Sequence, residues 1–125
     1  MSKIIVGFDF SSGSAKAVDL AIDISNRLGQ DLRLVYVKDK DQDEGPIREE
    51  IERRIEAVRP LFKGIDMDYV IRQGKVSQEI CDQCRIDDGS LIVVGTHGLS
   101  GFEKNWIGRN TYRTIAESHV PVLSI

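Results

Sequence analysis

The amino-acid sequence predicts an α/β fold in which an open, five-stranded parallel sheet is covered by helices on both faces. Short apolar runs bounded by turn residues alternate along the chain with longer segments whose apolar residues recur every three or four positions. The short runs are typical of strands buried on both faces, as in parallel sheets, and the longer segments are typical of amphipathic helices. The resulting order, β-α-β-α-β-α-β-α-β, predicts right-handed crossovers and a single domain over residues 1–125.

The first strand and the first helix are expected at Lys3–Phe8 and Ser14–Leu28. The strand contains the apolar run IIVGF, and Ser12 or Ser14 is a suitable N-cap for the helix that follows. Gly29 stands where a helix commonly ends in a left-handed residue.

The second strand, LRLVYV, is expected at Leu32–Val37. A charged segment without apolar residues, 38–46, comes next, and we expect a solvated loop there. A helix over Ile47–Phe62 is predicted because isoleucine, valine and phenylalanine recur on one stripe. The third strand is expected at Met67–Ile71, closed by Gly74.

Two helices and two strands are expected in the last part of the chain. A helix over Val76–Asp87 precedes the fourth strand, Leu91–Val94. A helix from Gly108 to about Ser118 precedes the fifth strand, Val120–Ile125.

Composition excludes some classes of partner. The net charge is −3 and no basic block is present, which argues against nucleic acid as a main partner. The apolar run at the N-terminus is too short for a signal peptide or a membrane span, so we expect no membrane span and a cytoplasmic location.

Glycines follow the fourth strand at regular intervals. Leu91–Val94 runs directly into Gly95, Gly98 and Gly101, and Gly108 precedes the predicted helix. A buried parallel strand, a glycine-rich loop and a helix N-terminus together suit a bound phosphate, at the sheet edge where ligands usually bind. The alternative reading is a flexible surface loop.

Other candidate chemical sites are weaker. Cys81 and Cys84 share the predicted buried face of a helix with Ile80, so we interpret them as small apolar residues and not as a redox pair. A zinc site would need further ligands, and His97 and His119 lie on other segments. We therefore expect no metal site.

No catalytic residue is predicted. The chain has no G-x4-G-K-[ST] loop, and Ser100 in GLSG does not match the G-x-S-x-G nucleophile elbow. His97 beside the glycine loop has no nucleophile placed next to it by any known signature.

The whole chain resembles the universal stress protein family, through the segments IIVGFDFS, LVYVKD, GKVSQEI, LIVVGTHG and PVLSI. The nucleotide-binding branch of that family carries G-x2-G-x9-G-[ST] after the fourth strand. Gly95, Gly98 and Gly108 match its glycine spacing, and Arg109 stands where the binders have serine or threonine. The resemblance implies a Rossmann-like fold of the adenine-nucleotide α-hydrolase type, with strand order 3-2-1-4-5.

The resemblance also implies a site for ATP, alone or with Mg²⁺, at the carboxyl ends of strands 1 and 4. Asp9 would accept hydrogen bonds from ribose or base, and Val37 would pack on the adenine. The site residues implied in this way are Gly7, Phe8 and Asp9 at the adenosine end, Val37, then Val94, Gly95, His97 and Gly98 at the floor and first phosphate, and Gly108, Arg109, Asn110 and Thr111 at the later phosphates.

Arg109 has two readings. An exposed cation in the first turn of a helix destabilises the helix by about 0.3–1 kcal/mol, because it lies at the positive end of the helix dipole. A bound phosphate would reverse this effect, because arginine offers a planar fork of donors. Alternatively, the long side chain fills the phosphate position or points to solvent.

The family resemblance implies a dimeric stress-response module that binds ATP, dimerising through the strand Val120–Ile125. Two alternatives stay open: a slow ATPase at the same site, and a nucleotide-free interaction dimer marked by Arg109. We expect a binding module more than an enzyme.

Overall fold

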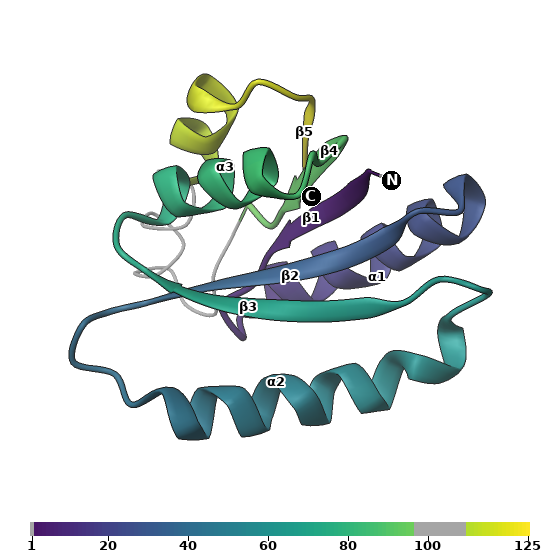
Figure 1. Cartoon of the computed structure of the whole chain (residues 1–125), viewed down its shortest axis with the longest axis horizontal. Coiled ribbons are helices and arrows are strands. Elements are labelled where there is room, and N and C mark those ends of the chain that lie inside the picture. Colours follow the sequence, from purple (N-terminus) through teal and green to yellow (C-terminus); the bar gives the residue numbers. More distant parts are fainter. Residues whose placement is uncertain (1, 97–109) are drawn as a thin grey trace.

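The computed structural model describes residues 2–96 and 110–125 and contains the predicted five-stranded sheet (Figure 1). All neighbouring strands are parallel, in the order β3-β2-β1-β4-β5, which confirms the expected topology. The strands are β1 (Lys3–Gly7), β2 (Asp31–Lys38), β3 (Met67–Gln73), β4 (Leu91–Val94) and β5 (Val122–Ser124). Central strand β1 pairs through Val6 with Leu34 on one side and Val93 on the other.

Helices cover both faces of this sheet. They are α1 (Ser12–Leu28), α2 (Glu44–Val58) with the 3-10 turn η1 (Arg59–Leu61), α3 (Val76–Ile86), and a helix over 110–117. Figure 1 shows α1 and α2 on one face, and α3 with the 110–117 helix on the other. No helix among the described residues is both long and apolar enough to cross a membrane.

Local hydrogen bonds explain where α1 begins. Ser11, and not Ser12 or Ser14 as expected, is the N-cap: its Oγ accepts a hydrogen bond from the Ser14 N–H at 3.1 Å. The helix therefore starts at Ser12, two residues earlier than predicted, and ends as predicted with Gly29 in the left-handed region (φ 68°).

The bounds of α2 differ from the prediction at both ends. Asp43 caps the helix through a hydrogen bond from the Gly45 N–H to its Oδ1 (3.2 Å), so α2 begins before the apolar stripe. At the other end Pro60 has no backbone N–H to continue the α-helical hydrogen bonds, and the chain continues as η1. The other described element bounds agree with the prediction to within two residues, including β5, which is three residues long, and the predicted start of the last helix at Gly108 lies outside the described residues.

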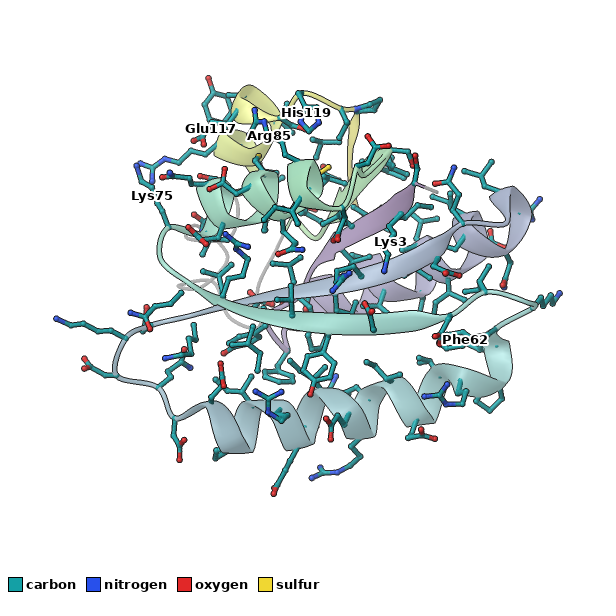
Figure 2. All side chains as sticks on the ribbon, in the orientation of Figure 1. Lys3, Phe62, Lys75, Arg85, Glu117 and His119 are labelled. Carbon is teal, nitrogen blue, oxygen red and sulfur yellow. The ribbon has the colours of Figure 1, made fainter. Side chains whose placement is uncertain are left out.

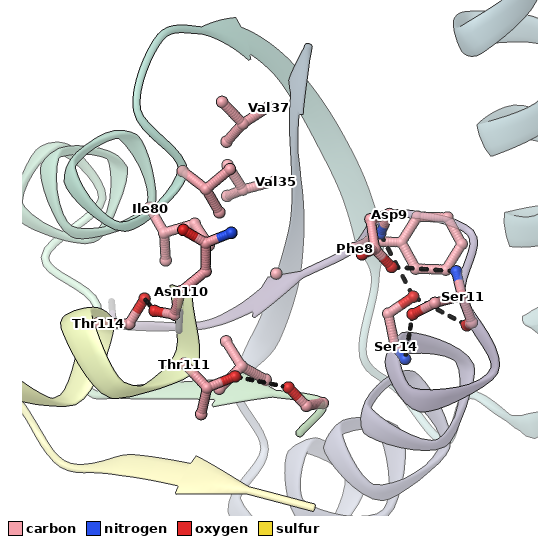
Figure 3. Close-up of a pocket in the computed structure, with 14 residues that line it drawn as sticks. Phe8, Asp9, Ser11, Ser14, Val35, Val37, Ile80, Asn110, Thr111 and Thr114 are labelled. Atoms are coloured by element: carbon pink, nitrogen blue, oxygen red, sulfur yellow. Dashed lines mark hydrogen bonds between the residues drawn. The ribbon is translucent and has the colours of Figure 1, made fainter. Parts of the chain in front are cut away.

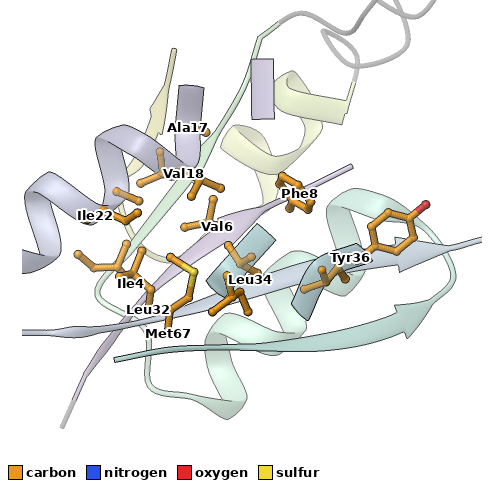
Figure 4. Packing of buried hydrophobic residues seen from close by; sticks show 14 of the residues in the cluster. Ile4, Val6, Phe8, Ala17, Val18, Ile22, Leu32, Leu34, Tyr36 and Met67 are labelled. Carbon is orange, nitrogen blue, oxygen red and sulfur yellow. The ribbon is translucent and has the colours of Figure 1, made fainter. Parts of the chain in front are cut away.

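Two apolar clusters lie on opposite faces of the sheet, because successive side chains of a strand alternate. The α1/α2 side contains even-numbered residues of β1 and β2, and Phe8 directly after β1 (Figure 4): Ile4, Val6, Phe8, Leu32, Leu34 and Tyr36. The α3 side contains Ile5, Val35, Ile80, Cys81, Cys84, Ile92 and Val94.

Cys81 and Cys84 lie in the second cluster as free thiols, as expected for small apolar residues. Burial raises the pKa of both thiols, that of Cys84 to about 11. Both cysteines are therefore protonated and unreactive near neutral pH.

The 110–117 helix is anchored to α3 and to the sheet. Ser77 Oγ on α3 donates to Glu117 Oε1 at 3.2 Å, and Figure 2 shows Glu117 projecting from this helix. Thr111 and Thr114 are its buried residues. This packing places the amino end of the described helix beside the carboxyl end of β4.

Candidate functional site

A pocket opens at the carboxyl ends of β1, β2 and β4. It encloses about 510 Å³, counted out to the solvent at its mouth. Its lining comes from the ends of three strands, the start of α1, α3 and the 110–117 helix: Gly7, Phe8, Asp9, Ser11, Ser14, Val35, Val37, Val76, Ile80, Val94, Gly95, Asn110, Thr111 and Thr114. In open α/β sheets this edge is the common ligand-binding position.

The structure brings most of the expected site residues together around this pocket. Those that border it are Gly7, Phe8, Asp9, Val37, Val94, Gly95, Asn110 and Thr111. The others, His97, Gly98, Gly108 and Arg109, lie outside the described residues. The role of each residue in binding a nucleotide stays a prediction.

Asp9 is positioned by hydrogen bonds within the β1–α1 connection (Figure 3). Its Oδ1 accepts from the Ser11 N–H at 3.0 Å, and its own N–H donates to Ser14 Oγ at 3.3 Å. Ser14 Oγ in turn donates to the Ser11 carbonyl at 3.0 Å. Among the described residues the second carboxylate oxygen of Asp9 has no hydrogen-bond partner, so it is available to a ligand.

Asn110 lies on the other side of the pocket from Asp9 (Figure 3). Its Nδ2 atom is buried and has no hydrogen-bond partner in the described structure. Buried polar groups are almost always paired, so an unpaired amide that borders a pocket indicates a missing acceptor.

The hydroxyl groups near Asn110 are already engaged. Thr111 Oγ1 donates to the Gly95 carbonyl at 2.7 Å, and Thr114 Oγ1 donates to the Asn110 carbonyl at 2.8 Å. The hydroxyl hydrogen of Thr111 is thus used inside the fold, and the role of Thr111 in holding phosphate stays a prediction.

Asp9 is the one charged side chain among the described residues of the lining, and the walls on the α3 side are apolar. The described part of the site therefore suits an uncharged, largely apolar group with a few polar atoms. No cluster of His, Cys, Asp or Glu that could hold a metal ion occurs in the part of the chain that the structure describes.

Several lining residues were missed by the sequence analysis: Ser11, Ser14, Val35, Val76, Ile80 and Thr114. Val35 faces the same side as Val37, two positions away on β2, so strand alternation could have found it. Val76 and Ile80 share one face of α3 at a spacing of four, and the sequence places Ile80 on the buried face of this helix without linking that face to a pocket.

Gly95 is required by packing within the fold. A Cβ built on Gly95 would lie 2.5 Å from the Gly13 carbonyl carbon and 2.6 Å from its oxygen, both backbone atoms of α1. This glycine lets β4 end directly against the first turn of α1. Gly7 is also tight, since its Cβ would lie 2.9 Å from Ile80 Cδ1.

A family model described as the universal stress protein family matches residues 1–125. Universal stress protein YxiE of Bacillus subtilis (strain 168) is 26% identical over 147 residues, covering 99% of this chain and 98% of that protein. The universal stress protein of Archaeoglobus fulgidus in complex with dAMP aligns with a TM-score of 0.78 at 18% identity, covering 100% of this chain and 98% of that one. A universal stress protein in complex with cAMP aligns with a TM-score of 0.76 at 19% identity, covering 99% and 96%.

We predict that Gly95→Ala destabilises the protein by about 1–3 kcal/mol, because the added methyl group overlaps backbone that has no room to move. Gly45→Ala is the matched control. The nearest atom to its added Cβ would be Asp43 Oδ1 at 3.8 Å, an ordinary contact, and alanine stabilises a helix relative to glycine by up to about 1 kcal/mol. Urea unfolding measures both. Equal stability of the Gly95→Ala variant and the parent protein would contradict this account of β4 and α1.

Proposed function

Because the chain belongs to the universal stress protein family, we propose that it is a cytoplasmic stress-response module that binds an adenine nucleotide, ATP in particular, at the carboxyl ends of β1 and β4. One observation carries this proposal. The same apolar pocket is bordered by a buried donor without a partner, Asn110 Nδ2, and by a free acceptor oxygen on Asp9. The proposed role is binding, and no group of the described site is assigned to catalysis.

In this proposal the adenine base and the ribose of the nucleotide occupy the described part of the pocket. Apolar side chains of Val35, Val37 and Ile80 offer a surface for a planar ring. The free oxygen of Asp9 accepts from a ribose hydroxyl or from the amino group of adenine. An unmet hydrogen bond at such a position costs about 1–3 kcal/mol, so this carboxylate also favours ligands that carry a donor there.

The phosphate groups are assigned to the amino end of the 110–117 helix and to the glycine segment before it. Asn110 Nδ2 donates to a ligand oxygen, and helix N-termini favour anions. Arg109, outside the described residues, is proposed to pair with the polyphosphate, with Mg²⁺ as a further partner of ATP. The dAMP and cAMP complexes named above support an adenine ligand for this chain, since both proteins share its fold.

We also propose a homodimer through residues Val120–Ile125. β5 is an edge strand of the sheet; Leu123 on it is 38% exposed, and Ile125, directly after it, is 41% exposed. An apolar edge strand pairs readily with another chain, and a second copy would cover it.

For the dimer, Leu123→Arg is expected to shift sedimentation from dimer to monomer at tens of micromolar protein, because two buried charges would face each other across the edge. Leu61→Arg, at a leucine that is 52% exposed on the far side of the sheet, is expected to leave the dimer intact. A parent protein that sediments as a monomer would refute the proposed dimer.

For Asn110, substitution by leucine is expected to change stability and binding in opposite directions. Removing an unpaired buried donor raises the free energy of unfolding by up to about 1 kcal/mol, while the lost hydrogen bond weakens ATP binding about three- to tenfold. Asn26→Leu is the control, since Asn26 Nδ2 donates to the Leu61 carbonyl (3.0 Å) away from the pocket. That variant should lose stability and keep its affinity.

Calorimetric titration with ATP and urea unfolding measure the two effects. If Asn110→Leu binds ATP as the parent protein does, the amide has no ligand partner and the proposed contact is wrong.

For Asp9, substitution by asparagine tests the acceptor without disturbing the turn. The asparagine oxygen can still accept from the Ser11 N–H. The other carboxylate oxygen, which is free in Asp9, is replaced by an NH₂ group that can only donate. We expect affinity for AMP and ATP to fall at least fivefold, with the melting temperature unchanged. Asp19→Asn, at an exposed position of α1 outside this pocket, should bind normally. A change of less than twofold in Asp9→Asn would assign Asp9 to the turn alone.

A further inference from the structure

Phe10 has a backbone conformation that bulky residues rarely adopt. Its φ is 66°, in the left-handed region, where a side chain with a Cβ is disfavoured and glycine is not. The residue stands between Asp9, which borders the pocket, and Ser11, which caps α1. The hydrogen bond from the Ser11 N–H to Asp9 Oδ1 therefore spans Phe10.

An aromatic cluster on the α1/α2 side of the sheet holds the Phe10 ring. The ring centroid lies 5.0 Å from that of Phe8, edge to face at 78°, and 5.2 Å from that of Tyr36. Figure 4 shows Phe8 and Tyr36 on the same side of the sheet. Such aromatic pairs stabilise the packing beyond the area they bury.

Arg54 of α2 completes this cluster. Its guanidinium carbon lies 5.6 Å from the Phe10 centroid and 5.8 Å from the Phe8 centroid, within range of a cation–π interaction. Arg54 Nε is also held by Glu50 Oε2 at 3.1 Å. Arg54 does not border the pocket at the carboxyl ends of the strands, whose helical lining comes from the start of α1, α3 and the 110–117 helix.

We propose that Phe10 is a positioning residue: its ring, held by Phe8, Tyr36 and Arg54, keeps the backbone at Phe10 left-handed and thereby holds the Asp9 carboxylate at the pocket. The inference rests on the proposed function for its ligand. Without the ring contacts, a residue with a Cβ relaxes to negative φ, and the turn that joins Asp9 to Ser11 opens. Packing on the α2 side of the sheet thus sets the affinity of a site on the α3 side.

Two substitutions separate the ring from the backbone conformation. Phe10→Ala and Phe10→Gly remove the same aromatic contacts, but only glycine adopts φ 66° at little cost. We expect Phe10→Ala to weaken AMP binding about five- to tenfold, and Phe10→Gly to stay within about threefold of the parent protein. Calorimetry with AMP measures both, after circular dichroism has shown that each variant is folded.

Amide hydrogen exchange without nucleotide gives a readout that does not depend on binding. The Ser11 amide should stay protected in the parent protein and in Phe10→Gly, and should exchange faster in Phe10→Ala. Arg54→Gln, which leaves the loop sequence intact, should also speed this exchange. Arg53→Gln, on the same helix with a side chain that is 71% exposed, should not.

Three results would overturn the inference: parent-like binding and exchange in Phe10→Ala, equal weakening in Phe10→Ala and Phe10→Gly, or unchanged exchange in Arg54→Gln. If the parent protein itself does not bind AMP, the proposed function fails. The exchange of the Ser11 amide then still decides whether the Phe10 ring holds the turn.

Discussion

The pocket depends on β1 lying in the middle of a parallel sheet. Its neighbours β2 and β4 run in the same direction, so the carboxyl ends of all three strands meet at one edge. Alternation along β1 then sends Val6 and Phe8 to the α1/α2 core, and Ile5 and Gly7 to the α3 side. Gly7 has no side chain to place there, and a Cβ would collide with Ile80. The space beyond it is bordered by valine and isoleucine side chains and stays open.

The polar groups around this space fall into two classes. The hydroxyls of Ser14, Thr111 and Thr114 are used inside the fold. Ser14 bonds to the loop before α1, Thr111 ties the 110–117 helix to the end of β4, and Thr114 bonds within its own helix. Within the part of the chain that the structure describes, Asn110 Nδ2 and one carboxylate oxygen of Asp9 have no hydrogen-bond partner. A buried unpaired donor and a free carboxylate oxygen that border the same pocket have the chemical pattern of a binding site, in which the ligand supplies the missing partners.

Much of this arrangement could be predicted from the sequence, because strong local signals and a specific resemblance agreed. Apolar runs placed all five strands, and the order β-α-β-α placed their carboxyl ends together. The N-cap of α1 was less predictable. Three nearby serines, at positions 11, 12 and 14, offer similar side chains, and only the three-dimensional turn at Asp9 selects Ser11.

The dual position of Phe8 also needs the structure, because Phe8 borders the pocket while its ring packs in the core on the other face of the sheet. No pattern in the sequence predicts a left-handed phenylalanine at position 10, since the contacts that hold it come from β2 and α2. Gly95 matched a ligand-binding motif, yet its close contact with Gly13 is a requirement of packing.

The central claim is that an adenine nucleotide binds between Asp9 and Asn110. Its most direct test is an NMR titration of the ¹⁵N-labelled protein with AMP and then ATP, in which each amide reports on its own surroundings. The account predicts saturable shifts of the Gly7, Asp9 and Asn110 amides and of the Asn110 side-chain NH₂, with the amides of η1 at the far end of the sheet unchanged. Shifts confined to other surfaces, or a spectrum that neither nucleotide alters, would contradict it.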